Sequence, residues 1–458
     1  MNEDHVPTGK KISWAVANIG SLAIGQASIL LLYAYYFLYL GVPLTPLGIS
    51  LVLMVYGIWD ALNEPLIGHI SDFSRSRWGR RKPFIAIGLV PLLICSYLIY
   101  TPPINDPIIC TVYLIVILIL YETSVTMVFT LWFALYPELT LDQNERLAIS
   151  RFKEIFGVLG LILGLAIAPL IAGSFKDPMM GFSLMGLTLG IIAVVCVLPT
   201  LFFIKERKEY QIIKENKLSF FKSIKISLKS RSFVCFIFVQ FLLQLSYSVV
   251  LSGLPLFFEG VLGMSSSEWA IQMLLIFLVV LPGLYVWIKI AEKKGTRYAL
   301  FISMMCFCLT FPLVFLVYTP ITMLIVLLIA GFGLGGLMLF PTVLLSDVID
   351  EDHTKTNERR EGIFNGVSGV IVKSSNAISW LVLGIILTVF QINRENVSPS
   401  TLTPLGELGL RILIGIIPIV FIALGMLFLY LYPLSGESLE EVKNKVRELN
   451  INLTKGLK

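Results

Sequence analysis

Charged residues are scarce in this sequence. Only 14% of its 458 residues are Asp, Glu, Lys or Arg, against about 25% in soluble globular domains. By contrast, 56% of the residues are hydrophobic and the mean hydropathy is +0.85. A soluble chain of this length would need a polar exterior over several domains. The scarcity of charge therefore excludes a water-soluble protein and predicts a polytopic membrane protein.

Cysteine and histidine are also few. The six cysteines lie inside apolar stretches and lack the spacing of a metal site or a disulfide framework. His5, His69 and His353 lie in a tail or near the ends of apolar stretches, and they form no constellation with a Ser or Cys nucleophile. We therefore expect no enzyme, no cofactor and no metal apart from a coupling ion.

Apolar windows of about 20 residues, long enough to cross about 30 Å of hydrocarbon, recur along the whole chain. The sequence predicts twelve transmembrane helices, and the N-terminal residues do not have the pattern of a removable signal peptide. The windows are centred near Ile29, Asp60, Pro91, Glu122, Gly160, Ile191, Leu243, Phe277, Met305, Gly331, Asn376 and Pro418.

Basic residues alternate between the two sides of this predicted topology. The two tails and every second connection hold 31 of the 35 Lys and Arg. Because basic loops are disfavoured for translocation, we expect both termini in the cytoplasm, with the protein in the plasma or cell membrane. The formal charge of +5 then mostly reflects the basic residues that orient the protein in the membrane. We therefore expect the lipid bilayer, not nucleic acid, as partner.

A basic polar interval divides the chain into two sets of six spans. It predicts an N-terminal six-helix bundle at 1–204, a cytoplasmic linker at 205–232, a C-terminal six-helix bundle at 233–433 and a cytoplasmic tail at 434–458. A weak repeat of Pro, Gly and basic residues after the second and eighth spans supports two parallel halves. Such halves resemble the major facilitator architecture, in which a central cavity opens alternately to either side.

Four ionisable residues fall near the middle of apolar spans: Asp60, Glu64, Glu122 and Lys373. Each costs several kcal/mol there unless it is paired or faces a wet cavity. Asp60 and Glu64 share one helix face, and Asn63 lies beside them. Two anions so close together require a bound cation, a shared proton or a basic partner. A static ion pair with Lys373 is the structural alternative.

A second charged cluster lies in the predicted cytoplasmic loops. Opposite charges at neighbouring helix ends would close the cytoplasmic side by salt bridges that break when the cavity opens inward. Topogenic charge in solvated loops is the simpler alternative. The candidate gate residues are Asp72, Arg80, Arg81, Glu145, Arg146, Arg151, Asp350 and Arg359.

Three segments carry a family resemblance. Trp59 to Pro65, followed by Gly68 and the basic run to Phe84, resembles the glycoside-pentoside-hexuronide:cation symporters of the major facilitator superfamily, which include melibiose permease. The segment from Tyr136 to Arg151 is similar to that family's loop after the fourth span. The segment from Asp347 to Lys373 is similar to its loop into the eleventh span.

The resemblance implies twelve helices in two bundles and symport driven by sodium or protons. It implies that Asp60, Asn63, Glu64 and Thr126 bind the coupling cation and that Lys373 lies next to them. The family's acids for sugar hydroxyls are missing, since the first span has no acid and Phe129 and Phe133 occupy the corresponding places in the fourth span. The cation half of the family site is thus present, and the sugar half is not.

The substrate therefore stays open between a glycoside or sugar-like solute and an amphiphile such as a lysolipid, which some animal relatives in the family carry. A channel or a non-transporting receptor on the same scaffold is the alternative from another class. We expect a monomer with a small-molecule substrate. The candidate cavity residues are Gln26, Glu122, Phe129, Trp132, Phe133, Gln240, Gln244, Tyr247, Asn376 and Trp380.

Overall fold

The computed structural model describes residues 6–72, 74, 76–140, 143–204, 206, 227–356 and 361–456. Every regular element in these ranges is a helix, and they contain no strand. In the region up to residue 206 the elements are α1 Thr8–Ala15, α2 Ala17–Ala34, η1 Tyr35–Leu40, α3 Pro46–Asp72, α4 Lys82–Leu98, α5 Pro107–Val125, η2 Thr126–Thr130, α6 Leu131–Ala134, α7 Tyr136–Leu139, α8 Gln143–Ile162, η3 Leu163–Ile167, α9 Ala168–Gly173 and α10 Pro178–Phe203.

The region after residue 226 is also helical. It contains α12 Arg231–Gly260, α13 Ser266–Lys294, α14 Thr296–Cys308, η5 Pro312–Leu316, α15 Pro320–Thr356, α16 Glu361–Val389, η6 Arg394–Asn396, α17 Pro404–Arg411, η7 Ile412–Ile416, α18 Ile417–Leu431 and α19 Glu437–Gly456.

The predicted all-helical membrane fold is confirmed. Eleven helices among the described residues are long and apolar enough to span a membrane, and the shorter apolar helix Lys82–Leu98 adds a twelfth. Each of the twelve predicted centres falls in a different one of these helices. The cytoplasmic placement of the termini stays a prediction.

Local sequence explains several helix boundaries. Asp106 accepts hydrogen bonds from the amides of Ile108 and Ile109, at 2.8 and 2.9 Å, and so caps α5. Asp177 caps α10 in the same way through the amide of Met179, at 3.1 Å. Each is followed by proline, whose missing N–H costs nothing at the first helical position. Acid-proline pairs thus begin two spans.

Among the described residues, four short π-helical segments, η1, η2, η3 and η7, lie within otherwise α-helical spans. The hydropathy pattern did not indicate them. Hydropathy reports how apolar a stretch is, and not whether its backbone hydrogen bonds span four residues or five. Such widened turns occur frequently at functional sites. One of them, η2, belongs to the fourth span, where the sequence predicts part of the cation site.

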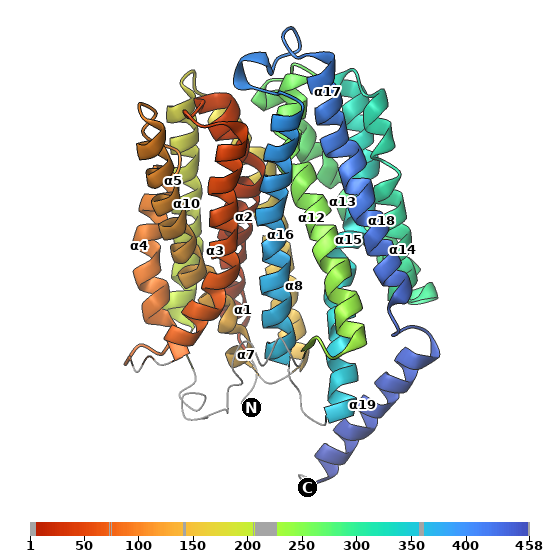
Figure 1. Cartoon of the computed structure of the whole chain (residues 1–458). Coiled ribbons are helices and arrows are strands. Elements are labelled where there is room, and N and C mark those ends of the chain that lie inside the picture. The colour runs from red at the N-terminus through yellow and green to blue at the C-terminus, as the bar shows by residue number, and fades with distance from the viewer. Residues whose placement is uncertain are drawn as a thin grey trace. The chain divides into compact units, whose positions relative to one another are not determined.

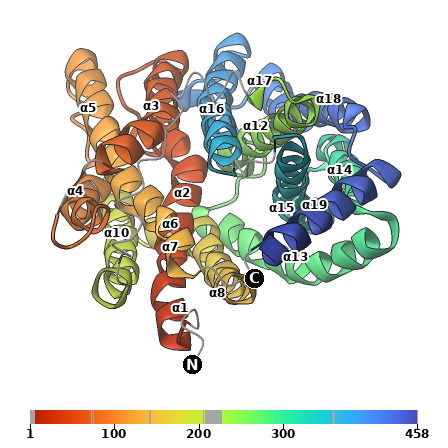
Figure 2. The ribbon, with the colours of Figure 1, turned by 90° about the horizontal axis from the view of Figure 1, so that it is seen from below.

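Contacts group the chain into two units. The first comprises 1–217, 251–274 and 380–410, and the second comprises 218–250, 275–379 and 411–458. In the first unit α10 packs on α2 and α4, and α5 packs on α3 and α4 (Figure 1). In the second, α14 packs on α15 and α18, while α19 lies along α15 (Figure 2). The division into bundles at the 205–232 linker stays a prediction, and residues 207–226 lie outside the described part.

Glycine brings helices of the first unit close together. A Cβ on Gly186 of α10 would lie 2.1 Å from the Ser96 carbonyl oxygen of α4. Gly160 and Gly164 approach α2 in the same way, each with a backbone oxygen 2.6 Å from the added atom. In lipid, where helices gain little from hydrophobic burial, such close backbone packing is a main source of association.

We expect Gly186→Ala to lower the thermal unfolding midpoint, because the new methyl group must push α4 and α10 apart at a cost of about 1–3 kcal/mol. Differential scanning fluorimetry of the purified protein would measure the change. Gly25→Ala in α2 is the matched control, since nothing lies within 4 Å of its added Cβ. A Gly186→Ala midpoint equal to that of Gly25→Ala would contradict the packing.

Candidate functional site

The helix α3 presents its acids away from lipid. Ile58, Leu62, Leu66 and Ile70 form an apolar stripe along it, each about half exposed. At about 100° per residue, Glu64 lies roughly 200° around the helix from Leu62. Its carboxyl group therefore faces the protein side of α3, and Asp60, one turn earlier, faces the same side.

The fourth span contacts this acidic face. The Thr130 hydroxyl of η2 donates to Glu64 Oε1 at 2.8 Å. Next to Glu64 on α3, the side-chain amide of Asn63, which is only 1% exposed, donates to the Glu122 carbonyl at 3.2 Å. The structure thus brings three of the predicted site residues, Asn63, Glu64 and Glu122, to one seam between α3 and the fourth span.

Thr126, the predicted fourth member of the cation site, heads η2 between Glu122 and Thr130. It is 1% exposed, and its hydroxyl oxygen has no hydrogen-bond partner. Buried hydroxyls are almost always hydrogen-bonded, so an orphaned one requires an explanation. Oxygen groups are the ligands that hard cations such as sodium prefer. The carboxyl, amide and hydroxyl groups of this seam therefore fit a bound cation.

Glu122 connects the seam to a predicted cavity residue. It is 4% exposed, and its carboxyl group is hydrogen-bonded to the hydroxyl of Tyr56, one turn before Asp60 on α3. The Tyr56 ring lies 5.4 Å from that of Trp380, centroid to centroid. The indole nitrogen of Trp380 is buried without a hydrogen-bond partner. The structure therefore places Trp380 within reach of the acidic helix.

Other cavity candidates of the first half are engaged in packing. Trp132 stacks on Trp14 with ring centroids 4.8 Å apart, and each indole donates to the other residue's carbonyl oxygen. Phe129 is buried where Gly20 approaches it. Phe133 is 51% exposed, and the Lys153 ammonium lies 5.5 Å from its ring centroid.

Gln26 lies on α2, where a Cβ on Gly164 would come within 3.2 Å of it. The role of Gln26, Phe129, Trp132 and Phe133 in a cavity stays a prediction.

A polar chain links two helices of the second unit. Gln244 of α12 donates to the Ser248 hydroxyl at 3.3 Å, and Ser248 donates to Asn376 Oδ1 on α16 at 2.7 Å. One turn earlier on α12, the amide oxygen of Gln240 is buried without a hydrogen-bond partner. Tyr247 lies on the same helix, and Lys373 lies one turn before Asn376 on α16. The structure thus brings Gln244 and Asn376 together.

The gate candidates after the second span bind an acid through their backbone. Glu206 accepts from the amides of Arg80, Arg81 and Lys82 at 2.7, 3.0 and 2.8 Å, and so caps the start of α4. Gly79, at a φ of 113°, leaves room for this carboxylate, since a Cβ there would lie 2.4 Å from Glu206 Cδ. The Arg81 guanidinium also donates to the carbonyl oxygen of Ala134. The loop after the second span therefore meets the end of the fourth span through Arg81.

Glu145, another gate candidate, pairs with the N-terminal segment. Its carboxylate lies 2.8 Å from the Lys11 ammonium and accepts from the Val6 amide at 3.0 Å. Arg151 is exposed on α8, and Asp350 is half-buried on α15. The side chains of Asp72 and Arg146, and the whole of Arg359, lie outside the described part of the chain. Their gate role stays a prediction.

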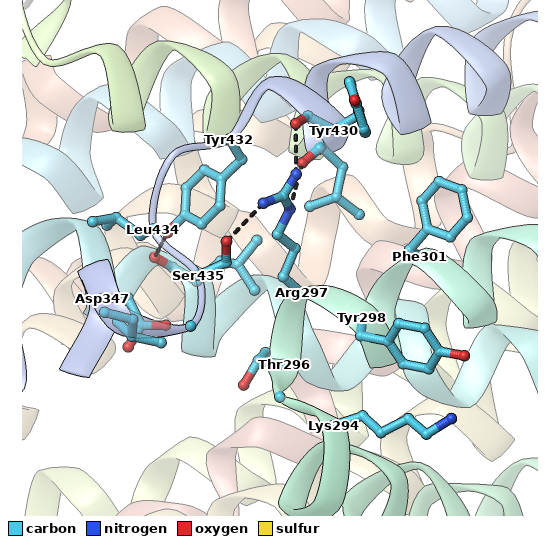
Figure 3. Close-up of a pocket in the computed structure, with 15 residues that line it drawn as sticks. Lys294, Thr296, Arg297, Tyr298, Phe301, Asp347, Tyr430, Tyr432, Leu434 and Ser435 are labelled. Atoms are coloured by element: carbon cyan, nitrogen blue, oxygen red, sulfur yellow. Dashed lines mark hydrogen bonds between the residues drawn. The ribbon is translucent and has the colours of Figure 1, made fainter.

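A cavity of about 430 Å³ in the second unit lies elsewhere, between the α13–α14 turn, α15 and the α18–α19 turn (Figure 3). Arg297 crosses it to donate to the carbonyls of Leu429 and Tyr430 and to Ser435 Oγ, at 3.1, 2.5 and 2.7 Å. Burial raises the pKa of the hydroxyl of Tyr432, which also lines the cavity. Arg297 thereby caps the end of α18, so we interpret this cavity as part of a structural joint.

Sequence reasoning missed two residues of the seam, Thr130 and Tyr56. Both lie four residues from a residue that it did identify, Thr126 and Asp60 respectively, so helical spacing was an available signal. Glu206 gave no such signal, because only the folded chain brings the end of α10 to the start of α4.

Comparison with known proteins agrees with this geometry. The family described as MFS/sugar transport protein matches residues 14–436. An uncharacterised symporter of Synechocystis sp. is 24% identical, with 95% of this chain and 96% of the relative covered. The sodium-dependent lysophosphatidylcholine symporter 1 of Mus musculus is also 24% identical, with 88% and 82% covered.

A solved structure of the xylose transporter of E. coli, in an inward open conformation, has the same fold. It aligns with a TM-score of 0.66 at 16% identity, covering 94% of this chain and 98% of the other. These relatives and structural neighbours are transporters and not enzymes. The chain therefore belongs to the MFS/sugar transport protein family and is a membrane symporter of the major facilitator type.

Proposed function

We propose that the protein couples the movement of a cation to that of a small solute by alternating access, with Asp60, Asn63 and Glu64 on α3 and Thr126 in η2 holding the cation. The observation that carries this proposal is the seam at mid-span. Two carboxylates one turn apart face the protein interior there, and a hydroxyl of the fourth span donates to one of them.

Sodium is the coupling ion we propose. The seam supplies carboxylate, amide and hydroxyl oxygens, which suit a hard cation, and the orphaned Thr126 hydroxyl is one such oxygen. The relative from Mus musculus is named as sodium-dependent. Lys373 provides the positive charge that balances the acids when the cation leaves. A proton is the alternative ion, and the experiments below separate the two.

A glycoside or sugar-like solute is the first substrate candidate. The chain from Gln244 through Ser248 to Asn376 offers amide and hydroxyl groups to a solute rich in hydroxyls. The Tyr56–Trp380 pair offers aromatic faces to a sugar ring. The family description as sugar transport also supports this candidate.

A lysolipid-like amphiphile is the second candidate. Relatives from mouse and zebrafish are named as lysophosphatidylcholine symporters. The first span lacks the acid that holds sugar hydroxyls in the resembling symporters, and Phe129 and Phe133 stand at the corresponding places of the fourth span. An acyl chain needs no hydrogen-bond partners and is compatible with these apolar positions.

Asp60→Asn and Glu64→Gln are expected to abolish the thermal stabilisation that sodium gives to the purified protein, because each removes a charged ligand. The measurement is the unfolding midpoint in sodium against choline at constant ionic strength. Glu292→Gln, at an exposed acid that pairs with Lys289 on α13, is the control. Stabilisation by sodium that persists in both seam variants would refute the assignment. Stabilisation by lowering the pH alone would favour the proton.

Thr130→Val is expected to weaken sodium binding about tenfold, since a hydrogen bond to a charged group contributes roughly 1.5–3 kcal/mol. The readout is the sodium concentration that gives half-maximal stabilisation. Thr130→Ser keeps the hydroxyl and is expected to restore binding. Thr111→Val is the matched control, because the Thr111 hydroxyl donates only within α5, to Pro107 at 2.8 Å. Equal sodium affinity in the Thr130 and Thr111 variants would contradict a role for Thr130.

We expect proteoliposomes containing the protein to accumulate a labelled glycoside when sodium is imposed as an inward gradient. Parallel vesicles receive a labelled lysophospholipid, and choline replaces sodium in the control. Accumulation of the lysophospholipid alone would transfer the assignment to the second candidate. If neither solute responds to sodium or to a proton gradient, coupled transport itself is wrong.

A further inference from the structure

We propose that hydrogen bonds to Glu259 form a latch that holds one end of the transport path closed, and that this latch must break before that end opens. The latch consists of Tyr39, Glu259, Ser266 and Trp269, all in the first unit. This inference rests on the proposed function, because a latch acts only where the path opens to each side in turn.

The latch joins the two halves of the sequence. Tyr39 lies in η1, at the end of the first span, and Glu259 is the penultimate residue of α12, the seventh span. Ser266 and Trp269 belong to the first turn of α13, the eighth span. The segment 251–274 groups with the first half of the chain. The connection between the seventh and eighth spans is therefore held by the end of the first.

The latch is a partly buried carboxyl group that accepts hydrogen bonds from neutral donors. The Tyr39 hydroxyl donates to Glu259 Oε1, and the Trp269 indole donates to the same oxygen at 3.2 Å. The Tyr39 hydroxyl also lies 3.1 Å from Ser266 Oγ, from which it can accept. One phenol thus bridges an acid of α12 and a hydroxyl of α13.

Arg394 binds the backbone at Tyr39, the latch residue of η1. Its guanidinium donates to the carbonyls of Leu38 and Tyr39, at 3.2 and 3.1 Å, from the connection between the eleventh and twelfth spans. Gly41, at a φ of 62°, follows η1, and a Cβ there would lie 1.9 Å from the guanidinium. The end of the first span is therefore fixed by two separate segments of the second half of the sequence.

Glycine contacts close the same end of the first unit. A Cβ on Gly384 of α16 would meet the Ser50 hydroxyl of α3 at 1.8 Å. One on Gly173 of α9 would lie 3.0 Å from Ser266 Cβ. These contacts tie the second span to the eleventh and the fifth to the eighth. Rocking of the two halves separates such pairs whenever the path opens on this side.

Hydrogen bonds suit this task because they exchange with water. When the latch opens, the Glu259 carboxylate and the Tyr39 hydroxyl become hydrated, so the net free energy lost per bond is small. An apolar contact of the same size would instead expose hydrocarbon surface to water. The latch therefore sets how often this end opens, and weakening it should raise the open population.

The test measures opening directly, without a known substrate. Ser252 is buried on α12 two turns before Glu259, on the same helix face. In a cysteine-free background, Ser252→Cys reports opening through its reaction with a membrane-impermeant maleimide added to intact cells. Adding Tyr39→Phe, which removes the phenol donor, is expected to speed labelling about tenfold. Glu259→Ala, which removes the acceptor oxygens, is expected to act in the same direction.

Tyr113→Phe is the matched control, because it removes one phenol hydrogen bond, to the Leu98 carbonyl at 2.9 Å, within the first half of the chain. Ser400→Cys, exposed between the eleventh and twelfth spans, shows which side the reagent reaches. If Ser400→Cys labels only in inverted vesicles, the comparison is made in those vesicles. Labelling of both latch variants at the rate of Tyr113→Phe would overturn the latch. Absence of coupled uptake in the unaltered protein would overturn the proposed function instead.

Discussion

A polar group without a hydrogen-bond partner is costly in hydrocarbon, and the organisation of this protein follows from that constraint. Because every backbone N–H and C=O must be satisfied inside the protein, the apolar stretches form helices. The same cost acts on side chains, so Asp60 and Glu64 are placed opposite the lipid-facing stripe of α3. One physical rule thus determines both the fold and the place where charge is retained.

This rule explains which features the sequence predicted. The twelve span centres fall in twelve different helices because the free energy of burying about 20 apolar residues exceeds any local preference. The acids of α3 were identified from the same cost, because a charged residue in the middle of an apolar span is rare and therefore stands out in the sequence. The assignment of Asn63 to this site rested on a spacing of three residues along a helix, which tertiary packing preserves.

Features that depend on contacts distant in sequence were not predicted. Glu206 caps α4 from 124 residues away, and Tyr39 reaches Glu259 across 220 residues. Hydropathy carries no information about such pairs, and neither acid lies mid-span. The contact of Trp132 was not predicted either, since the structure stacks its ring on Trp14 of the N-terminal helix. Composition indicates that an aromatic ring is buried, and only packing indicates what it contacts.

The π-helical turns connect the fold to the proposed mechanism. A π turn shifts the register of its span, so the residues before and after η2 present different faces to α3. Glu122, before the turn, offers a backbone carbonyl to Asn63, whereas Thr130, at its end, offers a hydroxyl to Glu64. Thr126, at the start of the turn, keeps an unmatched hydroxyl. In the proposed mechanism, the cation satisfies this oxygen on binding and releases it on leaving.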